Sequence, residues 1–162
     1  MLGLRFAGVV ALTLWVGGLL VLGAIAAPSI FEVLAAHQVT NDRVIAGAVF
    51  GEVLRRFHWL SYGCGFVLLS TLIARGVLGP RPIWFAARVG TACLMVAATA
   101  YSGLVVSSQI ARVQAEIGGA PSSLPESDPR RLAFGRLHAT STGLQMVPLL
   151  GGLLLLFREL KD

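Results

Sequence analysis

The sequence predicts an all-α fold, a polytopic four-helix transmembrane bundle, and two observations lead to this prediction. First, 56% of the 162 residues are hydrophobic and only 13% are charged, with a mean hydropathy of +0.78. A soluble domain of this size is normally more polar. Second, the chain contains four long apolar stretches that are almost free of charge. As helices, they match the roughly 30 Å hydrocarbon core of a bilayer.

These stretches predict a single transmembrane domain, residues 1–162, with spans at residues 6–31, 57–74, 86–111 and 137–157. An amphipathic extension from residue 46 leads into the second span, and Pro148 predicts a kink in the fourth. The first span could also be interpreted as a signal peptide, because Arg5 precedes its apolar core and Ala24-Ile25-Ala26 resembles a cleavage site. Its apolar region is longer than a signal peptide needs, which favours a span.

One long connection, from Arg112 to Arg136, joins the third and fourth spans. Its PSSLPESDP centre is typical of an exposed, mobile turn region. Asp128 and Pro129 then form a helix-start signal before RRLAFGRLH, so this loop can also hold a short amphipathic helix.

The formal charge of +5 comes from 13 basic and 8 acidic residues. The basic residues lie at the edges of the apolar stretches, which indicates a membrane protein and argues against nucleic-acid binding. Six of them fall on the side of the termini and seven on the other side, so the raw count does not fix the orientation. The short connection from Arg75 to Arg88 carries three arginines and no acid, and short loops count most. We therefore expect both termini in the cytoplasm and the protein in the inner (plasma) membrane.

A polar stripe opens the fourth span, with residues at positions i, i+3, i+4 and i+7: His138, Ser141, Thr142 and Gln145. This spacing places all four on one helix face. Lipid offers these groups no hydrogen-bond partner, so the stripe should face other helices or a wet cavity. The competing interpretation is that its polar groups only fasten the helices together.

The second span has a matching feature, since Arg55, His58 and Tyr62 are spaced i, i+3 and i+7 near the same membrane face. His58 and His138 are expected at similar depth, and Glu32 at the end of the first span could join them. Two imidazoles and a carboxylate can bind a transition metal, and two imidazoles alone can bind haem iron.

This reasoning makes His58, His138 and Glu32 the candidate metal ligands. The candidate ligand or cofactor pocket comprises His58, His138, Tyr62, Arg55, Ser141 and Gln145. In the simpler alternative, His58 is an interfacial residue beside Trp59, and Glu32 only pairs with Arg55 or Arg56.

Common catalytic motifs are missing from the sequence, which has no GKS/T loop, GxSxG elbow or HExxH helix. Cys64 and Cys93 both fall in apolar stretches and predict neither a disulfide framework nor a CxxC metal site. An enzyme is therefore disfavoured, although His138 could act as acid or base on a lipid-soluble substrate.

Three segments carry a family resemblance: LWVGGLLVLGAIAAPSIF, AGAVFGEVLRRFHWL and FGRLHATSTGLQMV. Together they resemble the uncharacterised membrane family that includes transmembrane protein 205. More distantly, the W-x-G-G-L and P-x-x-F elements are similar to copper-resistance D-type proteins and four-helix protoporphyrinogen oxidases, a similarity that implies copper or porphyrin handling. Those proteins tend to carry a histidine two turns before the tryptophan, where this chain has Ala7 and Gly8.

Two hypotheses follow. In the first, the protein binds a metal ion, haem or another small ligand in an intramembrane polar pocket and takes part in metal or solute handling. In the second, it is a non-catalytic membrane scaffold or accessory subunit. The lipid bilayer is the expected partner in both, and a homo-oligomer is compatible with both.

Overall fold

The computed structural model describes residues 2–79 and 83–161, and its regular structure is helical throughout this part of the chain. The first half contains α1 (Leu2–Val21), the π-helical turn η1 (Leu22–Ala26), α2 (Ala27–Ala36) and α3 (Asp42–Leu78). The second half contains α4 (Phe85–Ala100), the π-helical turn η2 (Tyr101–Val106), α5 (Ser107–Ile117), the 3-10 turn η3 (Pro121–Ser123) and α6 (Pro129–Glu159).

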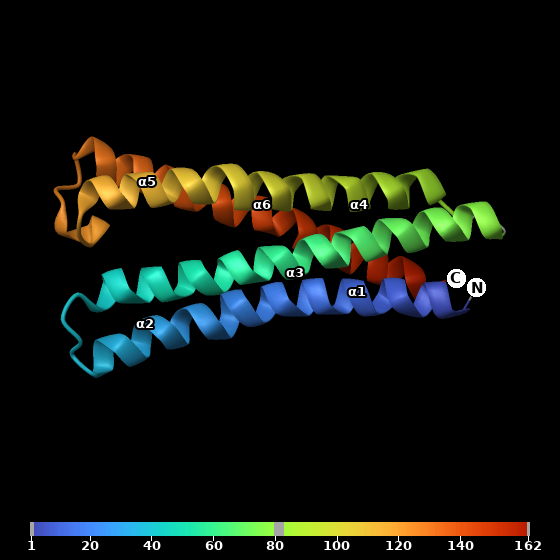
Figure 1. The fold of residues 1–162 in the computed structure, drawn as a ribbon, viewed down its shortest axis with the longest axis horizontal. Helices are drawn as coiled ribbons and strands as arrows, with labels where there is room; N and C mark the ends of the chain where they lie inside the picture. The colour runs from blue at the N-terminus through green and yellow to red at the C-terminus, as the bar shows by residue number, and fades with distance from the viewer. Residues whose placement is uncertain (1, 80–82, 162) are drawn as a thin grey trace.

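Four helical runs are long and apolar enough to cross a membrane within the described residues: Leu2–Ala36, Asp42–Leu78, Phe85–Ile117 and Pro129–Glu159. They alternate in direction, so both termini lie at one end of the bundle (Figure 1). The predicted all-α four-helix fold is confirmed. Each predicted span falls inside one of the four runs.

The helices close into a ring in which α1 packs on α3, α3 on α4, α4 on α6 and α6 on α1. Glycines allow close approach at these contacts. A Cβ atom added at Gly18 would lie 2.3 Å from Cε2 of Phe57, and one at Gly152 would lie 2.3 Å from Cγ2 of Val16. Small residues of this kind let helix backbones approach closely in membranes. The segment from Trp15 to Gly18 thus packs closely against α3 and α6.

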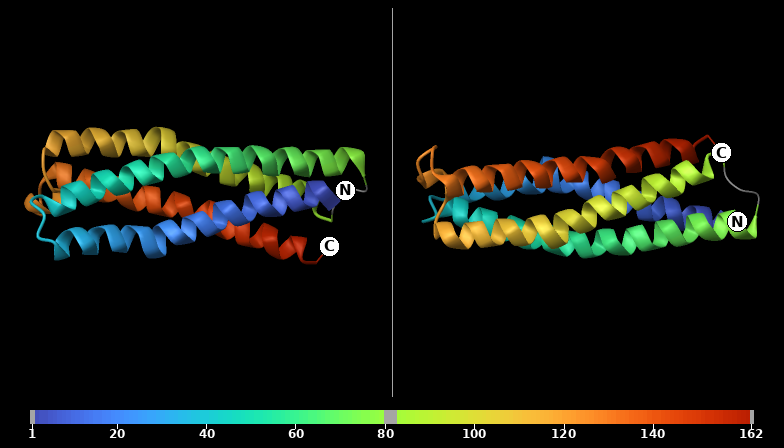
Figure 2. Two further views of the ribbon diagram at one scale, coloured as in Figure 1. Left: turned by 60° about the horizontal axis from the view of Figure 1, so that its bottom comes forward. Right: turned by 90° about the horizontal axis from the view of Figure 1, so that it is seen from above.

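At the end away from the termini, the elements contact mainly in two pairs, α2 with α3 and α5 with α6. Figure 1 and the two views of Figure 2 show these pairs extending to the connections at that end. The bundle is thus closed along its termini half and more loosely joined at the loop end.

Large apolar side chains point outward along the middle of the bundle, among them Phe66, Leu94, Leu104 and Leu150, each at least 60% exposed. Such a surface is unfavourable in water and suits hydrocarbon. Together with the four long helices, it makes the chain a multi-pass membrane protein.

The connection between the third and fourth runs is shorter than the sequence suggested. Helix α5 continues to Ile117, and α6 begins at Pro129, capped by the Asp128 side chain, which accepts a hydrogen bond from the Arg130 N–H. RRLAFGRLH therefore belongs to α6 and does not form a separate helix. The reason is that helices can continue past the hydrocarbon boundary, where polar side chains reach water.

Charged residues mark two levels along the helices. Glu52 and Arg75 are separated by 23 residues on α3, and Arg88 and Arg112 by 24 on the third run. At 1.5 Å per residue these separations are about 35 Å, close to the thickness of the hydrocarbon core. Helix α3 has 37 residues and is about 55 Å long, so its first turns extend beyond this slab.

Candidate functional site

A small internal cavity lies where the four runs meet. It has a volume of about 10 Å³, which is room for about one water molecule. The cavity is lined by Trp15 and Leu19 from α1, Leu54, Phe57, His58 and Ser61 from α3, Thr99 from α4, and Gln145 and Pro148 from α6. Every long helix of the bundle therefore contributes to one site.

Three lining residues carry buried polar atoms that lack a hydrogen-bond partner among the described residues: Nε1 of Trp15, Oγ of Ser61 and Oγ1 of Thr99. The three side chains are at most 6% exposed. Leaving a buried donor or acceptor unpaired costs roughly 1–3 kcal/mol. Three such groups, from three helices, therefore belong to residues that line one cavity.

The cavity lies near the middle of the predicted membrane slab. Trp15 is ten residues from Arg5, Thr99 is eleven from Arg88, and Gln145 is thirteen from Arg158. These separations place the cavity about 15–20 Å from the charged level at the termini end. At that depth lipid offers polar groups no partner, so any partner has to come from inside the bundle.

His58 is 6% exposed and forms one wall of the cavity. One ring nitrogen is hydrogen-bonded to the backbone of Leu54, one turn earlier. A carbonyl accepts that bond, so the second nitrogen of a neutral ring is left as an acceptor. His58 therefore complements the indole N–H of Trp15, which is a donor only.

The π-helical turn η2 approaches this wall at Gly103. A Cβ atom added at Gly103 would lie 2.4 Å from the Tyr62 hydroxyl and 3.0 Å from the His58 ring. Ser102, in the same turn, shares a 3.3 Å hydrogen bond with Ser141 of α6. Single π turns inside helices often occur at functional sites, and this one begins two residues after the cavity residue Thr99.

The structure brings some of the predicted site residues together. His58 and Gln145 line the cavity. Ser141 and Tyr62 do not line it, but Ser141 is hydrogen-bonded to Ser102 of η2, and Tyr62 lies close to Gly103 of the same turn. His138 does not join them, because it is exposed on α6 with its ring stacked on that of Phe134.

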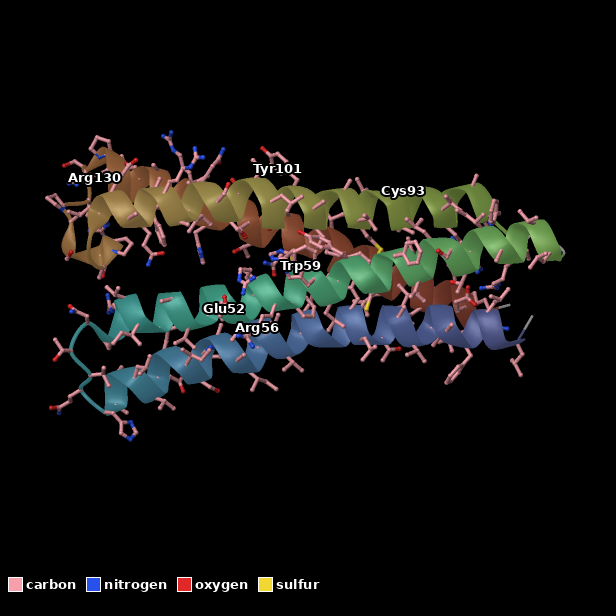
Figure 3. All side chains as sticks on the ribbon, in the orientation of Figure 1. Glu52, Arg56, Trp59, Cys93, Tyr101 and Arg130 are labelled. Carbon is pink, nitrogen blue, oxygen red and sulfur yellow. The ribbon has the colours of Figure 1, made fainter. Side chains whose placement is uncertain are left out.

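The predicted charged members of the site also lie elsewhere. Arg55 is exposed and pairs with Glu52 at 2.7 Å, as Arg56 does at 2.8 Å (Figure 3). Glu32 is exposed on α2. The expected pairing of Glu32 with Arg55 or Arg56 is thus replaced by a pairing within one helix, where residues at i+3 and i+4 are natural neighbours.

The described residues contain no group of three or more His, Cys, Asp or Glu side chains that could hold a metal ion. His58, His138 and Glu32 therefore do not form a three-ligand centre. A haem also has no room in a cavity of about 10 Å³ unless the helices separate. Hydropathy predicted the depth of these residues, but the rotation of each helix decides which side chains meet.

The sequence did not single out Ser61 and Thr99 as site residues, and Trp15 entered only through the family resemblance. Isolated hydroxyl groups in apolar stretches are common, so one alone is a weak signal. A usable signal was that Ser61 follows His58 by three residues, on the same helix face.

A second polar cluster lies at the termini end, and the sequence analysis did not detect it either. The Glu159 carboxylate of α6 accepts charged hydrogen bonds from Arg75 and Arg88, both at 2.8 Å, and lies 3.1 Å from Nε of Arg5. Arg5 also donates to the Glu159 carbonyl, and Arg88 donates to the Arg158 carbonyl at 3.3 Å. One carboxylate thus connects α1, α3, α4 and α6.

The fold and the buried polar site define the class as multi-pass α-helical membrane proteins. Within that class, the domain of unknown function DUF4149 matches residues 10–118, more than half of the chain. The chain therefore belongs to the DUF4149 family, and the expected membership of an uncharacterised membrane family is confirmed. No curated protein and no solved structure matches the chain. The similarities to transmembrane protein 205 and to copper-resistance D-type proteins stay predictions.

Proposed function

We propose that this protein binds a small polar molecule or ion, about the size of water, in the cavity beside His58. The observation that carries the proposal is the set of three buried polar atoms without partners, on Trp15, Ser61 and Thr99. A bound guest would satisfy these groups and recover the free energy lost by burying them.

The chemistry of the lining narrows the class of ligand. Trp15 donates only, the two hydroxyl groups and the Gln145 amide both donate and accept, and neutral His58 has one nitrogen left as an acceptor. One imidazole without a carboxylate or thiolate is a poor ligand set for a transition metal. A guest that both accepts and donates hydrogen bonds, or a compact ion of low charge, fits this lining better than a metal or a porphyrin.

Trp15 supplies a direct test, because its indole lies in the cavity wall while Trp59 and Trp84 are 66% and 65% exposed. Replacing Trp59 and Trp84 with Phe leaves Trp15 as the only tryptophan, and excitation selective for tryptophan excludes the two tyrosines. We expect its emission in detergent to change saturably with at least one small probe, among ammonium, fluoride and chloride, at constant ionic strength. The change should be lost in a Ser61→Ala, Thr99→Val variant.

Thr91→Val is the matched control for Thr99→Val. Thr91 lies on the same helix as Thr99, and its hydroxyl already donates to the Ala87 carbonyl. This variant should keep the response. If none of the three probes changes the Trp15 emission saturably, the proposal is wrong. The buried groups would then serve only to fasten helices together, as a scaffold or accessory subunit requires.

A further inference from the structure

The cluster around Glu159 has more positive than negative charge. Arg5 and Arg75 with Glu159 already carry one net positive charge, without counting Arg88. The Arg5 side chain is 36% exposed, while those of Arg75 and Glu159 are 14% and 9% exposed. Arg5 is therefore held in place by Glu159 and is still accessible from outside the bundle.

A groove of about 260 Å³ opens beside this cluster between α1 and α6. Arg5 and Glu159 form its polar wall, and Val9, Leu156 and Leu160 form its apolar wall. The groove thus combines an accessible guanidinium with a strip of aliphatic side chains that continues toward the middle of the membrane.

The depth of the groove matches a lipid headgroup. Arg5 directly precedes the first apolar stretch, and Glu159 follows the last one by two residues. This is the level at which the phosphate of a phospholipid lies and the acyl chains begin. Basic pockets between transmembrane helices can bind anionic headgroups.

We propose that this groove binds one anionic phospholipid, with its phosphate on Arg5 and an acyl chain along Val9 and Leu156. Charge complementarity selects the anionic headgroup, since a guanidinium already positioned by a carboxylate offers further N–H donors to phosphate oxygens. The apolar wall selects a lipid over a soluble anion.

Native mass spectrometry of the full chain in detergent tests the proposal with palmitoyl-oleoyl phosphatidylglycerol, and with phosphatidylcholine of the same acyl chains. We expect one phosphatidylglycerol to be retained in preference to phosphatidylcholine. Because a basic side chain near the membrane surface contributes about 1 kcal/mol to anionic lipid binding, Arg5→Gln should weaken retention about fivefold. Val9→Phe should weaken it as well, by filling the groove without changing any charge.

Two matched controls separate this site from general effects. Arg43→Gln removes the same charge at the loop end, where Arg43 donates to Ser122 at 3.0 Å. Val10→Phe adds the same bulk at a neighbouring residue that is 39% exposed. Both controls should retain the lipid like the unaltered protein, and melting curves of all variants check that they are folded.

The retention measurements would overturn the proposal in three cases: equal retention of the two lipids, an equal loss in Arg5→Gln and Arg43→Gln, or a Val9→Phe variant that binds normally. Inorganic phosphate and deacylated glycerophosphoglycerol identify the source of the anion. If either soluble anion displaces the lipid at the concentration at which the lipid itself binds, the site binds soluble anions and the lipid proposal is wrong.

Discussion

At the scale of single residues, three polar atoms of the cavity residues are buried but have no hydrogen-bond partner among the described residues. Ser61 is fully buried and Thr99 is 6% exposed, yet neither hydroxyl has a partner among the described residues. Elsewhere in the bundle the hydroxyl groups of Thr71 and Thr91 donate to backbone carbonyls of their own helices. The hydroxyl groups of Ser61 and Thr99 therefore differ from those of Thr71 and Thr91 in having no backbone carbonyl as a partner. The residue type alone does not reveal this difference.

Thr99→Val should raise the melting temperature in detergent when no probe is present. The substitution keeps the shape of the side chain and removes an unpaired buried hydroxyl, which is worth roughly 1 kcal/mol. Thr91→Val removes a bonded hydroxyl and should bring no gain. A Thr99→Val protein that melts no higher than the Thr91→Val protein would show that the hydroxyl is satisfied in the isolated protein.

Gly152→Ala should lower stability by roughly 1–3 kcal/mol, because the new methyl group would overlap Val16 at the contact of α1 with α6. Gly143→Ala on the same helix has no atom within 4 Å of its added Cβ. This control should be neutral or stabilising, since alanine is the better helix former. Thermal unfolding of both variants in detergent measures the difference, and equal effects would contradict the tight contact.

At the scale of elements, the length of a helix could be predicted from the sequence but its rotation could not. Runs without charge fix where a chain can cross hydrocarbon, so each predicted span falls inside one helical run. Which face of a helix turns inward depends on packing against its neighbours, for example at Gly18 and Phe57. This explains why His58 is buried while His138, expected beside it, is exposed.

The π-helical turns show a second limit of sequence reasoning. Pro28 removes the N–H that would bond to the Ala24 carbonyl, and η1 ends at Ala26, two residues before it, with the Ala27 N–H bonded to the Leu22 carbonyl. A disturbance near Pro28 could therefore be anticipated. The turn η2 contains no proline, and its position was not predictable from local sequence, although it brings Gly103 to His58.

The first turn of α6 should lose protection from hydrogen exchange in acid. Arg130 lowers the pKa of Asp128 below its ordinary value, first through a side-chain hydrogen bond and then through its backbone N–H. A carboxylate whose pKa is lower in the folded state stabilises the fold above its ordinary pKa, and this contribution disappears as the pH falls through the lowered value.

Asp128→Asn is the matched control for this effect. It keeps an oxygen at the cap, as Asn is an equally good capping residue, but removes the titration. Hydrogen exchange of the α6 amides, measured by mass spectrometry between neutral and acidic pH, should therefore change more in the unaltered protein than in Asp128→Asn. Identical pH profiles would contradict the role of the Asp128 carboxylate.

At the scale of the whole molecule, four helices depend on one carboxylate at the termini end. Glu159→Gln should reduce stability by about 3 kcal/mol, because it leaves the surrounding arginines without their buried counter-charge. Glu52→Gln breaks an ion pair at an accessible position of α3 and should have little effect, as exposed ion pairs contribute little. Melting temperatures in detergent measure the effect of each substitution. Equal losses of stability in Glu159→Gln and Glu52→Gln would contradict the role of the Glu159 carboxylate.

The even number of crossings places both termini on one side of the membrane. Reporter domains fused to the N-terminus and, separately, to the C-terminus should give the same result. The three arginines of the short connection from Arg75 to Arg88 make the cytoplasm the expected side. Reporters on opposite sides would contradict the fold, whereas two reporters outside the cytoplasm would contradict only the orientation.

The contrast between the two ends of the bundle bears on how a guest could reach His58. At the termini end, the ion pairs with Glu159 tie four helices together. At the loop end, the hydrogen bond between Ser102 and Ser141 is 3.3 Å long, which is long for a hydroxyl pair. If the guest proposed beside His58 exchanges through the more weakly joined end, it would exchange with one compartment only.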